Sequence, residues 1–437
     1  MKNNMLKQRF LSISIASVFL CLSSGSVAAT KIPELGTVYN PAKQLEIAKR
    51  LIDDPGTNTT DFETGLKWLK LAAAQQHPEA LLMLGFYHEY GVDGIAQNYD
   101  KAISLYKQAA GKGFTAAQFT LSLLFFRSDT PVYNVESGHY WLKQAASNND
   151  AQAQYNLAMF YKENPGLQAN DQDMLIWLHQ SADNGYKQAQ YTLGTYYLQG
   201  KYVVIDAGKA LSWFEQAAHQ GDAPSQYNIA LMYERGNGAA KDQEKAIYWY
   251  KLAATQKEPG AQFNLGRKYL FGQGLPKDIN KGIRLISDSA DAGNPAAQTM
   301  LANHFLIGQH TEKDFSKAFQ LYMAAAKNNY PEAQFRVSVM FAKGQGVTKD
   351  EKKSVHWISK AANQNHPTAQ YGLGAYLFNG VGVEKDLFLA AYWMSLAALQ
   401  GQKHALESRD SVIKLLSDSE IDDLNKRIDK IGKIQQQ

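Results

Sequence analysis

An Ala-Gln or Ser-Gln step recurs every 36 residues along most of this 437-residue chain. The first residues of these steps are Ala117, Ala153, Ala189, Ser225, Ala261, Ala297, Ala333 and Ala369. Ala405 continues the register, and Ala80 precedes it with one extra residue in the first interval. A fixed period of this length is typical of supersecondary units that stack in a row. The period therefore predicts a solenoid, although it does not by itself identify a ligand.

Each unit begins with the pattern of a short amphipathic helix, called helix A below. An apolar residue follows the repeat alanine by four positions, a small residue by five and an aromatic residue by eight, as in Leu193, Gly194 and Tyr197. These spacings place the side chains on one face of a helix. We expect the small residue to let a neighbouring backbone come close, because glycine in mid-helix otherwise costs about 0.5–1 kcal/mol.

The second helix of the unit, helix B, carries all the tryptophans of the chain at a single phase of the repeat. They are Trp68, Trp141, Trp177, Trp213, Trp249, Trp357 and Trp393. Leucine takes the same position in the remaining units, at Leu105, Leu285 and Leu321. A bulky residue confined to one phase indicates that it fills the same slot between helices each time, rather than forming an aromatic ligand cage.

Both helices end at regular signals. Helix B is followed by Gly113, Asn149, Gly185, Gly221, Gly293, Asn329, Asn365 and Gly401, with Gln76 and Lys257 as the exceptions. Glycine and asparagine tolerate the left-handed conformation that terminates a helix. Proline then falls in the first turn of the next helix A at Pro78, Pro259, Pro295, Pro331 and Pro367, where it loses no hydrogen bond. Gly-x-Gly pairs, such as Gly272 and Gly274, mark many of the turns from A to B. All these signals predict an all-α chain of A–turn–B–turn units.

The combined pattern resembles the Sel-one-like repeat, a relative of the tetratricopeptide repeat. The resemblance implies a right-handed α/α superhelical solenoid with nine repeats of about 36 residues in residues 78–404. Residues 30–77 are expected to form a lead-in and a degenerate capping repeat, and residues 405–437 to form C-terminal capping helices. Ser417 and Glu420 have the spacing of a capping box at the start of the last helix. The second and third repeats depart from the pattern at Ser128 to Pro131 and at Asn164 to Gly166, so we expect a different turn there.

Residues 1–29 have the composition of a secretory signal peptide. Three basic residues precede a short apolar run, and Val27-Ala28-Ala29 offers a cleavage site before Thr30. Cys21, the only cysteine, lies inside this segment, and Leu20 before it argues against a lipoprotein signal. The mature chain would therefore lack the disulfides that some extracytoplasmic relatives carry, and would contain no transmembrane span. Cleavage lowers the basic residues from 45 to 42 against 41 acidic residues, a net charge of +1, which removes the argument for nucleic-acid binding.

The sequence contains no arrangement that predicts a catalytic, metal or cofactor site. The ten histidines lack ligand spacing. Because some relatives are described as binding or hydrolysing β-lactams, the pairs Ser104/Lys107 and Ser411/Lys414 need attention. The companion motifs of such enzymes are absent, so we interpret both pairs as chance. The chain is expected not to be an enzyme, and a cell-wall-active or β-lactam-binding hydrolase is the alternative.

The remaining possibility is a binding surface on the A helices, which line the concave wall of such solenoids. Positions 3, 6 and 10 after the repeat alanine share one helical face and vary from unit to unit. The residues predicted to contact a partner in this groove are Asn156, Glu163, Thr192, Gln199, Asn228, Arg235, Asn264, Arg267, Asn303, Arg336 and Lys343. Amide and charged side chains on a regular frame suit a peptide or a glycan. The competing interpretation is a merely solvated face.

The resemblance implies adaptor function. Expected roles are envelope signalling, peptidoglycan or exopolysaccharide maintenance, or host-cell entry and virulence. The signal peptide places the chain in the periplasm of a bacterium, with an extracellular or outer-membrane-associated location as the alternative. The expected partner is a protein or peptide of the envelope, with a peptidoglycan-related partner as one form of it.

Overall fold

The computed structural model of the chain describes residues 39–53, 59–92, 94–165 and 171–435. The predicted signal peptide, residues 1–29, lies outside these ranges. Within them all regular secondary structure is helical and no strand forms, which confirms the all-α prediction. The chain divides into two compact units, one up to Gln220 and one from Gly221 onward, and each is described by itself.

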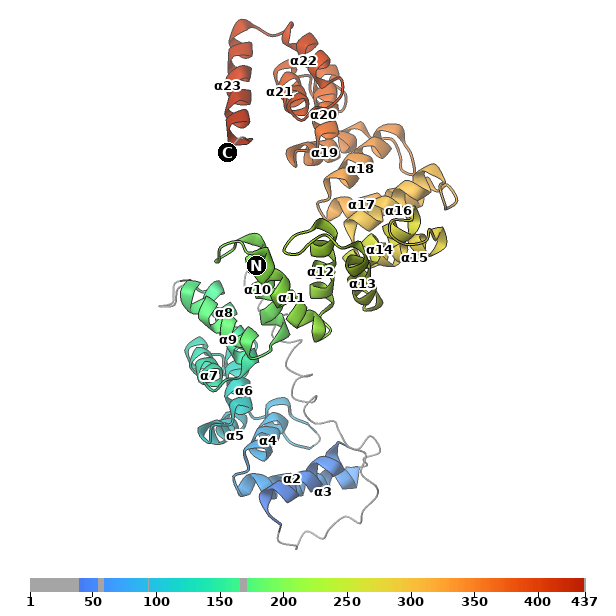
Figure 1. Ribbon diagram of the computed structural model, residues 1–437. Coiled ribbons are helices and arrows are strands. Elements are labelled where there is room, and N and C mark those ends of the chain that lie inside the picture. Colours follow the sequence, from blue (N-terminus) through green and yellow to red (C-terminus); the bar gives the residue numbers. More distant parts are fainter. Residues whose placement is uncertain (1–38, 54–58, 93, 166–170, 436–437) are drawn as a thin grey trace. The chain divides into compact units, whose positions relative to one another are not determined.

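Nine pairs of helices A and B form the body of the chain (Figure 1). The A helices are α4 (Pro78–Tyr90), α6 (Thr115–Phe126), α8 (Ala151–Glu163), α10 (Lys187–Gln199), α12 (Ala223–Arg235), α14 (Pro259–Phe271), α16 (Pro295–Ile307), α18 (Pro331–Lys343) and α20 (Pro367–Asn379). The B helices are α5 (Tyr99–Gly111), α7 (Val135–Ser147), α9 (Asp171–Asp183), α11 (Ala207–His219), α13 (Gln243–Thr255), α15 (Ile279–Asp291), α17 (Phe315–Lys327), α19 (Glu351–Asn363) and α21 (Leu387–Leu399). Within each of the two compact units, every A helix packs most extensively on the B helix of its own repeat, and each B helix also packs on the A helix of the next repeat. The A helices α16 and α18 also contact each other directly.

Additional helices flank the repeats at both ends. Helices α2 (Pro41–Ile52) and α3 (Thr59–Ala74) pack together before the first full repeat, and Trp68 of α3 is completely buried. Helices α22 (Ala405–Ile413) and α23 (Asp418–Gln435) follow the last repeat and contact α21. The predicted capping box is present, because Ser417 donates its backbone N–H to Glu420 and its hydroxyl oxygen accepts from the Glu420 N–H.

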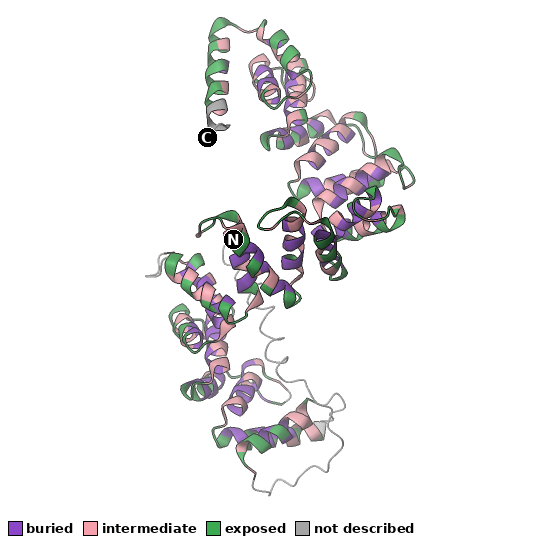
Figure 2. Ribbon diagram, in the orientation of Figure 1, coloured by how far each residue is buried: buried purple, intermediate pink, exposed green. Residues whose placement is uncertain are grey.

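The predicted apolar stripe of helix A is the buried core of each repeat, and Figure 2 shows the buried residues gathered on one side of the helices. The small residue of the stripe accommodates a side chain from helix B more often than a backbone. A methyl group at Gly194 would lie 2.7 Å from the ring of Phe214, and one at Gly374 would lie 2.7 Å from Met394. At Gly266, however, the nearest atom is the carbonyl oxygen of Gly282, at 2.9 Å. The expected close contact with a backbone is therefore found at Gly266, whereas at Gly194 and Gly374 the nearest atoms belong to a side chain of helix B.

The tryptophans fill the predicted packing position, but they are not the deepest residues of helix B. In the full repeats they are half-buried, whereas the next residue is almost completely buried, as at Phe214 and Tyr250. Trp141, Trp213 and Trp357 each pack against a core cluster that combines the preceding repeat with the helix A of their own repeat. The tryptophan therefore covers the edge of the core, and its neighbour lies inside it.

Every predicted stop after helix B is left-handed. The eight glycine and asparagine positions have φ between +60° and +88°, and the two exceptions, Gln76 and Lys257, adopt φ +63° as well. Left-handed backbone is unfavourable for residues with a Cβ atom, so the repeat geometry imposes this conformation on both. The turn from A to B behaves similarly, because His310 and Tyr202 take the left-handed conformation that glycine has in the Gly-x-Gly turns.

The turn of the second repeat keeps the closure of the other repeats despite its different sequence. The N–H of Asn134 donates to the carbonyl of Phe125 at 2.8 Å, as the N–H of Asp242 donates to Tyr233 in a Gly-x-Gly repeat. The Thr130 hydroxyl also donates to the Arg127 carbonyl. The local sequence thus changes the path of the turn and not the helix pairing. Part of the equivalent turn in the third repeat, including Gly166, lies outside the described residues.

The glutamine of the Ala-Gln step closes most repeats through its amide. Its Nε2 donates to a carbonyl eight residues earlier, at the end of the preceding helix B, as Gln154 does to Ala146 at 3.1 Å. Its Oε1 accepts from an amide 30 residues later, at the end of its own helix B, in the pairs Gln118–Asn148, Gln154–Asn184, Gln190–Gln220, Gln226–Gln256, Gln334–Gln364 and Gln370–Gln400. Because these glutamines are buried, both halves of the amide need a partner. The requirement explains why glutamine follows the repeat alanine.

Candidate partner-binding face

The surface of helix A opposite the core stripe is the strongest candidate site. We call positions 3, 6 and 10 after the repeat alanine in α12, α14, α16 and α18 the A-helix face of the second unit. Of the residues predicted to contact a partner, Glu163, Gln199, Arg235, Arg267 and Lys343 are exposed. Thr192, Asn228, Asn264, Asn303 and Arg336 are half-buried. The first four predicted residues in chain order belong to the first unit and the other seven to the second, so each set is described by itself.

One predicted residue is not on the surface. Asn156 is only 7% exposed on α8, so its amide is not available to a partner. The position is polar in sequence, but the neighbouring helices cover it. The prediction that Asn156 lines a groove is therefore corrected.

Several other predicted residues are occupied by bonds within the scaffold. The Asn264 amide donates to the Tyr250 hydroxyl at 3.3 Å, and the Tyr322 hydroxyl donates to Asn303 at 2.6 Å. Arg336 forms an ion pair with Glu332 at 2.7 Å. The helical spacing identified these side chains as variable, but it could not show that Asn264 and Asn303 each bond to a neighbouring helix, or that Arg336 pairs with a carboxylate on its own helix.

A buried ionic network lies beneath the A-helix face of the second unit. Glu234 on α12 accepts hydrogen bonds from Tyr250 on α13 and from Lys268 on α14. Lys268 is 5% exposed, so a charged partner for its ammonium group is required. Burial raises the pKa of Glu234, but the hydrogen bonds from Lys268 and Tyr250 outweigh it and hold the pKa below its ordinary value. Because both carboxylate oxygens are engaged, Glu234 serves as a junction of three helices.

The first unit contains a network of the same kind. Glu89 on α4 is 4% exposed and accepts from the Tyr106 hydroxyl at 2.8 Å and from the Arg127 guanidinium. Arg127 also lies over the ring of Tyr90, 5.4 Å from its centroid. Burial raises the pKa of Glu89 in spite of these two donors. This network again joins helices, because Tyr106 lies on α5 and Arg127 follows α6.

The A-helix face of the second unit also contains two apolar residues that our sequence prediction of the site left out. Position 10 reads Arg235, Phe271, Ile307 and Lys343 along α12, α14, α16 and α18, and all four are exposed. Phe271 is 53% exposed and Ile307 is 61% exposed. The prediction selected polar and charged residues alone. The signal that could have identified the apolar pair was its position, since both residues lie outside the core stripe.

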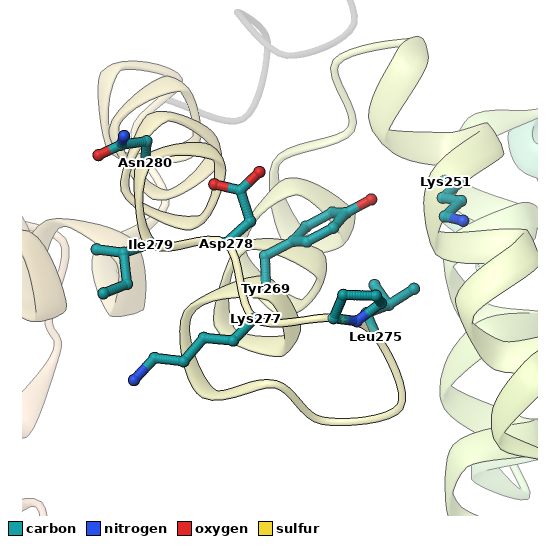
Figure 3. A pocket seen from close by; sticks show the side chains of 8 residues that line it. Lys251, Tyr269, Leu275, Lys277, Asp278, Ile279 and Asn280 are labelled. Atoms are coloured by element: carbon teal, nitrogen blue, oxygen red, sulfur yellow. The ribbon is translucent and has the colours of Figure 1, made fainter.

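An open hollow of about 890 Å³ lies at the turn between α14 and α15. It is lined by Lys251, Tyr269, Leu275, Pro276, Lys277, Asp278, Ile279 and Asn280. Figure 3 shows that the lysine side chains lie on opposite sides of Tyr269 and do not converge. Asp278 accepts from the Lys281 N–H at 2.9 Å as the N-cap of α15. The hollow therefore has no group positioned for chemistry.

The two Ser–Lys pairs do not form a catalytic arrangement. Ser104 and Lys107 are both exposed on α5, and the Ser104 hydroxyl accepts a long bond of 3.5 Å from Gln108. The Ser411 hydroxyl donates to the backbone of Glu407 at 2.9 Å. In the part of the chain that the structure describes, no three His, Cys, Asp or Glu side chains group closely enough to hold a metal ion. No described helix combines the length and apolar character needed to cross a membrane.

Stacked pairs of short antiparallel helices, closed by a repeated amide link, define the class of helical-repeat solenoids. The chain belongs to the Sel1 repeat family. The family's repeat matches residues 56–77, 78–114, 115–150, 151–186, 187–222, 223–258, 259–294, 295–330, 331–366 and 367–402. Sel1 repeat proteins generally mediate protein–protein interactions.

Two solved structures support the assignment. A protective antigen of uropathogenic Escherichia coli strains that displays an SLR fold is 25% identical, with a TM-score of 0.56 over 88% of this chain and 90% of that chain. A Sel1 repeat protein from Oxalobacter formigenes is 27% identical, with a TM-score of 0.56 over 81% of this chain and 98% of that chain. No curated protein matches the chain.

Proposed function

We propose that this Sel1 repeat chain is a secreted, non-enzymatic adaptor that binds a protein partner on the A-helix face of its second unit. The observation that carries the proposal is that each repeat contains one set of residues that maintains the fold and another set that varies and is partly exposed. The core stripe, the tryptophan phase, the amide link and the turn residues are all engaged in packing or hydrogen bonds. Positions 3, 6 and 10 of helix A differ from one repeat to the next, and several of their side chains remain exposed. Specific recognition needs such differences on a regular frame.

Photo-crosslinking tests where the partner binds. A photoreactive phenylalanine analogue replaces Phe271 on α14 in one variant and Tyr248 on α13 in the other. The two side chains are 53% and 57% exposed, so they are matched in accessibility. They differ in that Phe271 lies on a helix A and Tyr248 on a helix B. Irradiation of cells that express each variant should give a discrete protein adduct at Phe271 and none at Tyr248. Equal adducts at both positions, or an adduct at Tyr248 alone, would contradict the proposal.

Secretion into the bacterial envelope is the second part of the proposal. It is supported by the charged start, the apolar run and the Val27-Ala28-Ala29 site of the sequence. Amino-terminal sequencing of the protein from a periplasmic fraction should give Thr30 as the first residue. A full-length chain in the cytoplasm would contradict secretion and leave the binding face untouched. Envelope signalling, peptidoglycan or exopolysaccharide maintenance and host-cell entry are the roles that the family resemblance proposes for such an adaptor.

A further inference from the structure

We infer that the partner of the second unit presents an acidic peptide segment with apolar anchors to the A-helix face. The inference rests on the proposed function and specifies the chemistry of the partner. It combines the two unpacked apolar side chains with the cations that surround them.

The first observation is the apolar pair. Phe271 and Ile307 occupy position 10 in successive A helices, and neither belongs to the hydrophobic clusters of the described chain. Position 10 is the last residue of helix A, where the other A helices of this unit carry Arg235, Lys343 and Asn379. Two exposed apolar residues thus occupy equivalent positions in successive repeats, and exposed apolar groups are typical of interaction sites when polar groups surround them.

The second observation is the charge around this pair. Arg235 and Lys343 lie one repeat before Phe271 and one repeat after Ile307, and Arg267 lies one turn before Phe271 on the same helix. Among the described residues, no carboxylate lies within ion-pair distance of any of these three cations. Arg267 instead rests over the ring of Phe263, 5.6 Å from its centroid. Glu234, the residue before Arg235, also interacts electrostatically with Arg267, but its two carboxylate oxygens are already bound to Lys268 and Tyr250. The face therefore presents three cations that are not held in an ion pair.

Part of this charge also suits the fold. A cation in the last turn of a helix interacts favourably with the helix dipole, which accounts for Arg235 and Lys343 without a partner. The same argument gives no reason for Arg267, which lies in the middle of α14, or for the exposed Phe271 and Ile307. The combination of the three is what a ligand with acidic and apolar side chains would require.

The spacing of the repeat suggests how such a segment binds. Equivalent positions in neighbouring A helices are roughly 10 Å apart, the width of a helix. An extended peptide rises about 3.3 Å per residue, so about three residues separate its anchors. Apolar residues three apart would then meet Phe271 and Ile307, with acidic residues on either side meeting Arg235 and Lys343.

A displayed peptide library selected on the purified full chain tests this chemistry. Enriched peptides should carry Asp or Glu beside two apolar residues about three positions apart. Their affinity should fall about tenfold or more for the double variant R235E/R267E, since charge complementarity is reversed. Salt should weaken the binding, because exposed charges are screened over about 8 Å at physiological ionic strength. Phe271→Ser with Ile307→Ser should abolish the preference for apolar residues.

The matched control variants make an equal change in charge, and a similar loss of apolar surface, on the B helices. Lys251 on α13 and Arg284 on α15 are exposed, so K251E/R284E has the same net charge as R235E/R267E, and Tyr248→Ser serves for the apolar pair. These controls should leave affinity within about twofold. If the enriched peptides are basic or neutral but their binding still requires Phe271, the inference that the partner is acidic would be overturned. The proposed binding face would then be kept. No enrichment, or binding that depends on the helix B variants instead, would overturn the inference, and an absent crosslink at Phe271 would then overturn the proposed function too.

Discussion

Individual residues divide into those that the fold needs in every repeat and those that it leaves free. The distinction follows burial more closely than residue size. Trp213 is the larger side chain, yet Phe214 has no exposed surface and lies against Gly194. The sequence indicates that both positions pack, because both are apolar at a fixed phase. It does not rank them by burial, because burial depends on how closely the surrounding helices cover each ring.

We expect Phe214→Ala to lower the free energy of unfolding by about 3–5 kcal/mol, the usual cost of truncating a buried aromatic residue. Trp213→Ala should cost less, about 2 kcal/mol, since part of its ring already contacts water. Urea denaturation followed by circular dichroism measures both. A larger loss for Trp213 would show that the half-buried ring contributes more than its neighbour.

Lys257 is a residue whose conformation is set by the repeat and not by its own preference. It is exposed and left-handed with φ +63°, where glycine or asparagine stands in most repeats. Lys257→Gly should stabilise the second unit by about 0.5–1 kcal/mol, because relief of the left-handed strain exceeds the extra entropy of glycine in the unfolded chain. Asn329→Gly is the control and should change the melting temperature little. Destabilisation by Lys257→Gly would indicate that the lysine side chain contributes to packing.

Single helices are held by polar links as much as by apolar stripes. The boundaries of the helices could be predicted closely, since proline, glycine and asparagine mark them locally. The polar links could not be predicted, because the bonded residues are 30 or more positions apart in sequence. The sequence also placed Asn264 and Arg336 on a free surface, although one bonds Tyr250 on the neighbouring helix and the other bonds Glu332 one turn away on its own helix.

The repeat of Gln262 has no amide at the position that closes six of the other repeats. Ala292 stands 30 residues later, and the Oε1 of Gln262 is buried without a hydrogen-bond partner. Ala292 is exposed at the end of α15, so a glutamine fits there. We expect Ala292→Gln to stabilise the second unit by about 0.5–1.5 kcal/mol, the net value of one hydrogen bond. Ala292→Met, which adds a similar volume and no donor, should show no such gain in thermal denaturation.

The junction of α12, α13 and α14 should respond asymmetrically to mutation. Glu234→Gln leaves the buried Lys268 ammonium without its anion and should cost about 2–4 kcal/mol, whereas Lys268→Met leaves a carboxylate that water can reach and should cost less than about 1 kcal/mol. The pKa of Glu234 is lowered in the folded state, so its contribution is complete above the unfolded pKa, near 4.5, and is lost as pH falls through the folded pKa. The difference between wild type and Glu234→Gln should therefore shrink as the pH falls below about 4.5 and vanish below the folded pKa. Chemical denaturation across pH 3–8 checks both points, and a pH-independent difference would contradict the ionic account.

At the scale of the whole molecule, each repeat packs on its neighbours within each of the two compact units. Stability in such proteins is a sum of local terms, so damage stays near its origin. The fold class follows from the period alone, whereas the family's repeat also matches residues 56–77, which the sequence predicted to be a degenerate cap. The division into two compact units at Gln220 does not follow from the period, since the repeat continues through that point in sequence.

The C-terminal cap should be required by the second unit alone. Helix α21 is apolar on most of its surface, and Leu424 of α23 is 1% exposed against the same core cluster. Deletion of residues 417–437 should lower the melting temperature of the second unit and speed hydrogen exchange in α20 and α21. Exchange in α6 to α8 should be unchanged. Faster exchange in both units would show that they unfold together.

The glutamine link has a consequence for how such a chain can grow. Because its bonds join the end of one helix B to the start and end of the next pair, the junction between repeats allows no change in length. The one extra residue in the first interval of the chain instead falls in the turn from A to B, between Gly91 and Asn98. Each 36-residue repeat therefore has the same junction at both ends and can in principle replace another repeat. Gene duplication could lengthen the row, or recombination reorder it, and each new order would present a different set of exposed side chains on an unaltered frame.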